Sequence, residues 1–468
     1  MANNKHLKDS SVSKGLFVLG GLGVISMISE GLYGVLDKYF VSTLGIEEVQ
    51  AVSLVFGITF LIIAIAMWLS IGGMVSVSTA NGRKDSEAVR RSAVTILGMA
   101  ILGGAVLNFV LYYFSNELLS IFTLSPTSKI TEAVIFKANE YLQVFSFASI
   151  PMVFMLSLVF VLRSLGYSAM PTIATIMSAV INGSFDYYIV TFTEVGIKGI
   201  ALATVTGFTV SSVFLLFVFY KNWNKTKQED TKVFYEYFSI HAAKEVLSFG
   251  LPSLGKQIAT FAAITIFNLF ATEVSDDMVA GWGVSNDIFT LALYISYGLN
   301  VGMMPMLGNS YGAGDNKRSL EIINTTLIAS TAIFLTYSVV VYTFAYEIMG
   351  IYFTNTETIE VGVSVLRLVA FSFPTVAFVM HGSNAMQVLN KKTASLVVGI
   401  SRQLIFFVPF VGGIFLLNKL TGSSINIVLG QVLADFMAFF IMIYFYKTII
   451  KEKLYMKTPS RLSRDQQL

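Results

Sequence analysis

The stretch Asn81-Gly82-Arg83-Lys84-Asp85 follows a long apolar run in the first half of this chain, and Tyr311-Gly312-Ala313-Gly314-Asp315 follows another in the second half. One constant offset, without a gap, aligns the two stretches and continues upstream of them. The aligned pairs are Phe40 and Phe270, Val49 and Val279, Gly72 and Gly302, Gly82 and Gly312, and Asp85 and Asp315. The agreement indicates that the chain contains two copies of one structural unit.

The composition is that of an integral membrane protein. Hydrophobic residues make up 55% of the 468 residues and charged residues only 13%, whereas a soluble domain carries about 25% charge. Continuous apolar runs also exclude a transmembrane β-barrel, whose strands are short and alternate. A bilayer is crossed by about 20 apolar residues, and we therefore predict an all-α protein with twelve transmembrane helices. They are placed at about 15–40, 49–77, 92–114, 138–162, 169–191, 199–220, 246–271, 279–304, 320–345, 362–388, 394–417 and 425–447.

A polar stretch over 221–244 separates six predicted helices from six. We interpret it as a cytoplasmic linker between two pseudo-symmetric lobes, residues 14–220 and 245–450, with cytoplasmic tails at 1–13 and 451–468. Duplicated membrane halves are typical of transporters, in which one repeat rocks against the other around a site held between them.

Lys and Arg in the connections predict the orientation. If the N-terminus is inside, nearly all of them fall on the inside, and both termini face the cytoplasm. The outside connections then keep only Lys129, Lys137, Lys198 and Lys419. We expect a multi-pass protein of a bacterial plasma (inner) membrane.

The sequence does not support an enzymatic function. The segment Gly250–Gln257 nearly spells a phosphate-binding loop, but Gln257 stands where that loop needs Ser or Thr, and the segment lies in a predicted membrane helix. The three histidines lack metal-ligand spacing. We therefore expect no catalytic residues and no cofactor. The net charge of +3 mostly reflects the inside bias, so we expect no nucleic-acid partner.

Acidic residues stand inside the first predicted helix. An acid at the bilayer centre costs about 2.5–3.5 kcal/mol, so its presence needs a reason. Glu30 and Asp37 are almost two turns apart and share one face, with Tyr33 and Gly34 between them. Gly34 would leave room beside the pair. The alternative is that both acids lie near the outer end of the helix, in reach of water.

The fifth predicted helix adds Asn182 and Asp186 at positions i and i+4 of one face. An amide beside a carboxylate suits reversible protonation, or a sodium ion held by oxygens. The alternative is a polar clamp between helices. In the sixth helix the Thr204 hydroxyl can join this group, although such hydroxyls often bond their own backbone.

Deep carboxylates are rarer in the second half, where Asp287 and Asp435 are the exceptions. Lys256 instead stands in the seventh helix, just beyond Pro252. It is either a cation that faces a cavity or pairs with an acid of the first lobe, or a structural or snorkelling lysine.

These residues together resemble the multidrug and toxin extrusion (MATE) family over all twelve helices. The resemblance rests on the two duplicated stretches that end at Asp85 and Asp315, and on further sequence segments that occur in the family's order. These segments are Leu32 to Val41, Leu44-Gly45, Leu162 to Gly166, Asn182-x-x-x-Asp186 and Gly199 to Thr204. The family implies two six-helix lobes in a V that open alternately to each side. It also implies antiport, in which proton or sodium re-entry drives the export of lipophilic, often cationic, drugs.

The resemblance also implies roles for particular residues. Asp37, Asn182, Asp186 and Thr204 match the coupling site of the subtype that binds H⁺ or Na⁺ in the first lobe. Glu30, Tyr33 and Lys256 are then expected to contact the substrate, since an acidic, aromatic cavity attracts lipophilic cations. One departure is Leu22, which stands where family members often have a proline in the first helix. The expected partners are a small lipophilic molecule and the lipid bilayer, with the protein acting as a monomer.

Two other functions compete with drug export. A flippase for lipid-linked saccharides or lipid precursors, from the same superfamily, would need a large cationic cavity, to which Lys256 and Arg402 would contribute. A carrier of the major facilitator type would need a signature loop of glycines and paired arginines after its second helix. The loop Gly82-Arg83-Lys84-Asp85 does not match that signature.

Overall fold

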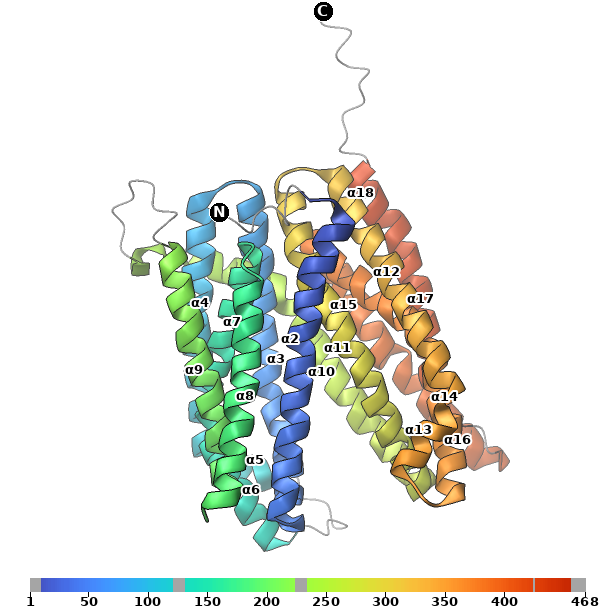
Figure 1. Cartoon of the computed structure of the whole chain (residues 1–468). Helices are drawn as coiled ribbons and strands as arrows, with labels where there is room; N and C mark the ends of the chain where they lie inside the picture. Colours follow the sequence, from blue (N-terminus) through green and yellow to red (C-terminus); the bar gives the residue numbers. More distant parts are fainter. Residues whose placement is uncertain (1–9, 121–130, 224–233, 424–425, 456–468) are drawn as a thin grey trace, which may run out of the picture. The chain divides into compact units, whose positions relative to one another are not determined.

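The computed structural model describes residues 10–120, 131–223, 234–423 and 426–455, and the regular elements in these ranges are all helices (Figure 1). Eleven described helices are long and apolar enough to cross a membrane, and the bent pair α6 (Glu132–Ser146) and α7 (Ser149–Ser164) forms a twelfth span. The chain is therefore an all-α, multi-pass membrane protein, which confirms the predicted fold class. The predicted tails and linker lie partly outside the described residues.

The remaining helices follow one another with short connections. Those of the first half are α2 (Val12–Leu44), α3 (Ile46–Gly82), α4 (Ser86–Tyr113), α5 (Ser115–Ser120), α8 (Ala169–Phe192) and α9 (Ile197–Trp223). Those of the second half are η3 (Phe234–Tyr237), α10 (Ile240–Val274), α11 (Asp276–Gly312), α12 (Asn316–Thr343), α13 (Ala345–Tyr352), α14 (Thr356–Val388), α15 (Lys392–Ile400), η4 (Ser401–Ile405), α16 (Phe407–Thr421), α17 (Leu429–Phe445), η5 (Tyr446–Lys451) and α18 (Glu452–Tyr455).

Internal contacts divide the described chain into two compact units, and both boundaries fall inside helices. The first unit runs from Ile25 to Gly250, and the second unit contains the chain up to Val24 and from Leu251 onward. The sequence instead suggests lobe boundaries at residues 14 and 245, in polar segments. The difference arises because two long helices cross from one unit to the other. Helix α2 begins in the second unit and continues in the first, and α10 begins in the first unit and continues in the second.

Glycines explain these crossings. In the second unit, a Cβ added to Gly23 would lie 2.2 Å from the carbonyl oxygen of Gly298, so the start of α2 packs directly on the backbone of α11. In the first unit, a Cβ added to Gly250 would lie 1.9 Å from the carbonyl oxygen of Trp68, and the Trp68 indole donates to the Leu247 carbonyl at 2.9 Å. Close packing against α11 therefore requires the glycine at position 23, which follows Leu22 directly.

The duplicated loops adopt the same turn. Asp85 caps α4 and Asp315 caps α12, each accepting a hydrogen bond at 2.9 Å from the backbone N–H three residues later. The residue before each cap has a left-handed backbone, with φ 61° at Lys84 and 77° at Gly314. The repeat seen in the sequence thus corresponds to a repeated helix connection.

The predicted helix over 138–162 is bent by 48° between α6 and α7. Pro151 has no N–H to donate to the carbonyl of Phe147, which interrupts the helical hydrogen bonds. Phe147 and Ala148 instead bond the carbonyls three residues earlier, at 3.2 and 2.8 Å. The bend follows from this local change in hydrogen bonding.

A second interruption lies in the predicted helix over 394–417. Here α15 continues into the π-helical segment η4, where the N–H of Phe406 bonds the carbonyl of Ser401 at 3.0 Å. Pro409 follows and leaves the carbonyl of Ile405 without its helical partner. Insertions of this kind are frequent at functional sites, and this one carries Arg402 and Gln403.

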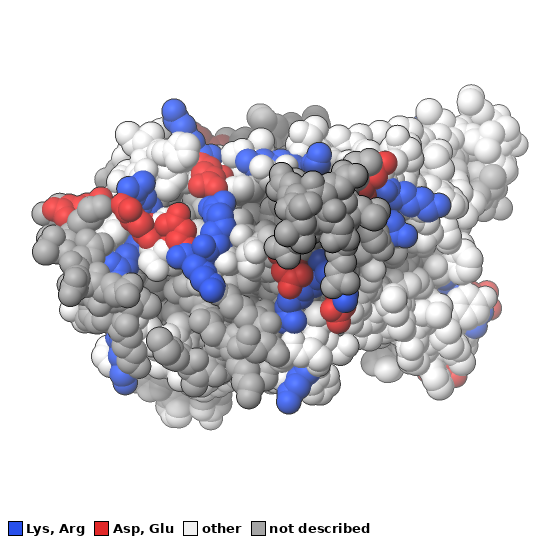
Figure 2. All heavy atoms as spheres, turned by 90° about the horizontal axis from the view of Figure 1, so that it is seen from above, with Lys and Arg blue, Asp and Glu red and all other residues white. Residues whose placement is uncertain are grey.

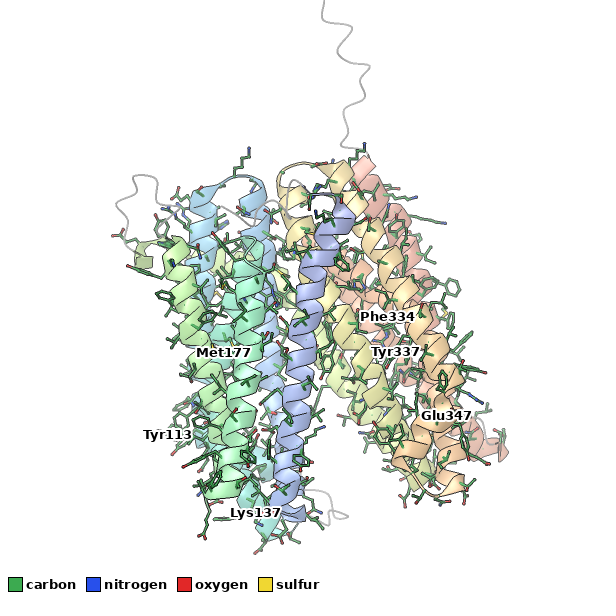
Figure 3. All side chains as sticks on the ribbon, in the orientation of Figure 1. Tyr113, Lys137, Met177, Phe334, Tyr337 and Glu347 are labelled. Carbon is green, nitrogen blue, oxygen red and sulfur yellow. The ribbon has the colours of Figure 1, made fainter. Side chains whose placement is uncertain are left out.

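Each unit has its own apolar core. In the second unit, Phe334 of α12 is fully buried, and the neighbouring Tyr337 stacks on Phe373 and donates to the carbonyl of Ile288 at 2.8 Å (Figure 3). The cores hold the helices of each unit in register, so polar side chains that face inward have fixed neighbours.

Candidate functional site

Three helices of the first unit bring polar side chains together around Thr204. The Tyr33 hydroxyl of α2 lies 3.3 Å from Thr204 Oγ1, and Asn182 of α8 donates its Nδ2 to the same oxygen at 3.3 Å. Thr204 is 1% exposed. Its hydroxyl therefore connects α2, α8 and α9 inside the unit.

A glycine allows α8 and α9 to approach at this level. A Cβ added to Gly207 would lie 2.9 Å from the carbonyl oxygen of Ser178 and 3.4 Å from Asn182 Cβ. Gly207 is one turn beyond Thr204 on the same face of α9. A larger residue at position 207 would push Thr204 away from Asn182.

Two carboxylates lie beside this group. Asp37 of α2 is 8% exposed and Asp186 of α8 is fully buried, and the two lie close enough for each charge to act on the other. Within the described residues, no hydrogen-bond donor reaches Asp37 Oδ1, Asn182 Oδ1 or either carboxylate oxygen of Asp186. Buried polar atoms are rarely left without a partner, because their desolvation is costly. These four oxygens are the strongest indication of a ligand in the first unit.

The chemistry of these atoms suits a small cation. Carboxylate, amide and hydroxyl oxygens are hard donors that accept a proton or coordinate an alkali ion. Among the described residues, no group of three or more His, Cys, Asp or Glu side chains has the arrangement of a metal site. The oxygens of Asp37, Asn182, Asp186 and Thr204 therefore fit H⁺ or Na⁺ better than a transition metal.

The Asn182 amide has two possible partners in this group. Asp186 is its neighbour at i+4 on one face of α8, a spacing that allows a hydrogen bond between the two side chains. In the structure, Asn182 donates to Thr204 instead, which leaves both Asp186 oxygens open to a cation.

Sequence reasoning missed Tyr141 as a member of this site. Tyr141 of α6 is 4% exposed, stacks on Phe145 with ring centroids 5.5 Å apart, and lies within the electrostatic reach of Asp37 and Asp186. A tyrosine in an apolar segment was the only signal available, and this chain has 21 tyrosines.

Arg163 at the end of α7 gives Glu30 a different role from Asp37. Arg163 is 1% exposed, donates from Nη2 to Ser26 Oγ at 2.7 Å, and interacts electrostatically with Glu30. Ser26 Oγ in turn donates a hydrogen bond to Thr172 Oγ1 at 3.1 Å. Glu30 thus has a cationic neighbour, although it shares a helix face with Asp37.

In the second unit, Lys256 and Arg402 have different partners. Lys256 Nζ donates to Asn384 Oδ1 at 2.9 Å and to Gln387 Oε1 at 3.4 Å. Arg402 forms an ion pair with Asp435 at 2.6 Å. The flippase alternative needs a large cationic cavity to which both residues contribute, and the ion pair of Arg402 with Asp435 argues against it.

The MatE family model matches residues 24–188 and 252–411, which together make up more than half of the chain. The chain belongs to the MatE family of transporters. The two MatE matches begin next to the points at which α2 and α10 pass from one unit to the other.

Members of the MatE family with similar sequences include the multidrug export protein MepA of Staphylococcus saprophyticus, 24% identical over 371 residues and 78% of each chain. The probable multidrug resistance protein NorM of Thermotoga maritima is 23% identical over 368 residues and 75% of each chain. A crystal structure of MATE in complex with MaL6 has a TM-score of 0.87 at 22% identity, covering 97% of this chain and 100% of that one. It shows the same fold.

Substitution of two buried aspartates tests whether Asp186 binds a ligand or holds the helices together. Asp186→Asn should leave the thermal unfolding temperature in detergent unchanged or raise it, because the carboxylate has no protein partner to lose. Asp435→Asn should lower stability by about 3 kcal/mol or more, because it leaves Arg402 buried without its counter-charge. A large loss of stability in Asp186→Asn would show that Asp186 is a structural clamp.

Proposed function

We propose that this chain is a multidrug exporter in which re-entry of a cation, H⁺ or Na⁺, drives the outward movement of a lipophilic cation. The export of drugs is inferred from the names of the MatE relatives. The single observation that supports the cation is the set of buried oxygens of Asp37, Asn182 and Asp186 without donors. In a membrane interior such oxygens are expensive unless a cation binds them.

The coupling ion binds between α2 and α8 in this scheme. Asp37 and Asp186 hold the ion, while Asn182 Oδ1 and the Thr204 hydroxyl complete its coordination. If the ion is a proton, two carboxylates that interact take it up as a pair rather than as single groups. Binding of the ion removes negative charge from the first unit and thereby weakens its attraction for a cationic drug.

The substrate binds to the same helix as the ion. Tyr33 and Glu30 are half-buried on α2, and the Tyr33 ring meets Phe208 edge-on with centroids 6.2 Å apart. An aromatic face near acidic groups attracts lipophilic cations. Because Tyr33 also contacts Thr204, ion and drug compete for neighbouring groups of the first unit, which makes binding of one oppose binding of the other.

Transport by purified protein in liposomes tests this coupling. An imposed pH gradient or an imposed sodium gradient should move a fluorescent lipophilic cation uphill, and the effective gradient identifies the ion. Asp37→Asn should reduce this movement to the level of protein-free liposomes. Glu347→Gln should keep the wild-type rate, because Glu347 is an exposed acid on α13 (Figure 3). Uphill movement of the dye by Asp37→Asn at the wild-type rate would contradict the proposed coupling.

The proposed orientation places the α3–α4 turn in the cytoplasm. Arg83 and Lys84 are exposed at this end of the first unit, which faces the viewer in Figure 2. At the other end, near Lys137 in Figure 3, lysines are neutralised. Lys137 lies 2.6 Å from Glu47 and 2.7 Å from Glu48, and Lys198 lies 2.7 Å from Glu140. Lys129 lies outside the described residues.

Cysteine labelling checks this orientation without background, since the chain has no cysteine. Lys84→Cys and Asn116→Cys place exposed thiols at the two ends of α4. In intact cells a membrane-impermeant maleimide should label Asn116→Cys only. Lys84→Cys should become reactive after permeabilisation. The reverse pattern would overturn the proposed orientation.

A further inference from the structure

Lys256 lacks the counter-charge that the other deep cation of the second unit possesses. Among the described residues, no carboxylate lies within ion-pair distance of Lys256, and its partners are the amide oxygens of Asn384 and Gln387. Arg402, by contrast, is paired with the buried Asp435. Neutral oxygens compensate only part of the cost of a cation in apolar surroundings. Within the described residues, Arg402 thus has a counter-charge and Lys256 has only neutral partners.

The side chain of Lys256 is held in position by a neighbouring helix. A Cβ added to Gly399 of α15 would lie 2.5 Å from Lys256 Cγ, 2.9 Å from Cδ and 3.0 Å from Cε. The aliphatic stem thus lies across a notch left by Gly399, and the ammonium group points toward α14. A snorkelling lysine that only seeks water would need no such notch.

The acceptor Gln387 and the face of α10 that carries Lys256 make further polar contacts. Gln387 Nε2 donates to Ser253 Oγ at 2.9 Å, and Gln403 Nε2 donates to Thr260 Oγ1 at 2.7 Å. Ser253, Lys256 and Thr260 lie on one face of α10, while Gln403 comes from the π-helical segment η4. Gln387, one of the two acceptors of Lys256, is thereby oriented by a hydrogen bond of its own, and Lys256 as a whole is only partly buried.

We infer that Lys256 and the Asn384 amide form a binding site for the carboxylate of a transported amphiphile. The ammonium group supplies the charge, and the Asn384 side chain can turn its NH₂ group toward a bound carboxylate. This inference rests on the proposed export function and extends its substrate class. Besides lipophilic cations, the transporter accepts amphiphiles that carry a carboxylate.

A pair of matched dyes tests the site. One is a rhodamine with a free benzoate, and the other is its methyl ester, so only the anionic group differs. Their affinities are measured by fluorescence titration of purified protein in a neutral detergent. Lys256→Gln should weaken binding of the acid by about tenfold or more and leave the ester unchanged, because a hydrogen bond to a charged group is lost. Lys256→Arg should retain affinity for the acid.

A second variant moves the lysine without removing its charge. Gly399→Ala should displace the stem of Lys256 and weaken binding of the acid selectively. Gly413→Ala is the matched control, since a Cβ at Gly413 of α16 meets no atom within 4 Å, and it should bind both dyes as the wild type does. Unchanged ester binding also shows that each variant is folded.

Two results would overturn the inference. Equal affinity of the wild type and Lys256→Gln for the acid would show that the ammonium group is not a ligand. An equal loss for acid and ester in Lys256→Gln would show that Lys256 only holds α10 and α14 together. Neither titration needs an ion gradient, so the result stands apart from the transport test with Asp37→Asn.

Discussion

A charge inside the hydrocarbon region needs an opposite charge or a full set of hydrogen bonds, and this constraint orders the whole molecule. Arg402 meets it with Asp435, and Arg163 meets it in part, with a hydrogen bond to Ser26 and the electrostatic interaction with Glu30. Asp37, Asp186 and Lys256 do not meet it within the described protein. We interpret the first group as structural and the second as the groups that bind ions and substrates.

The duplicated architecture determines how binding at these groups can act at a distance. Helix α2 begins in the second unit, packed on α11 through Gly23, and carries Tyr33 and Asp37 in the first unit. A cation at Asp37 therefore changes the charge of a helix that belongs to both units. In repeat-built transporters, alternating access moves one repeat against the other.

Much of this could be predicted from the sequence, and the rest depends on contacts that sequence patterns do not encode. Twelve spans follow from hydropathy, and the i, i+4 spacing of Asn182 and Asp186 places both on one face of α8. The partner of Arg402 could not be predicted, because Asp435 lies 33 positions away on another helix. Tyr141 was indistinguishable from other aromatic residues. The boundaries of the two compact units could not be predicted, because they depend on close packing at Gly23 and Gly250 rather than on a polar segment.

In the proposed scheme, a small cation and the substrate compete for the carboxylates of the first unit. The affinity of the purified protein for a lipophilic cation, measured as a function of pH and of sodium concentration, tests this competition directly. Acidification or sodium should weaken binding by the wild type, and neither should affect binding by Asp37→Asn. Wild-type affinity independent of both pH and sodium would contradict it.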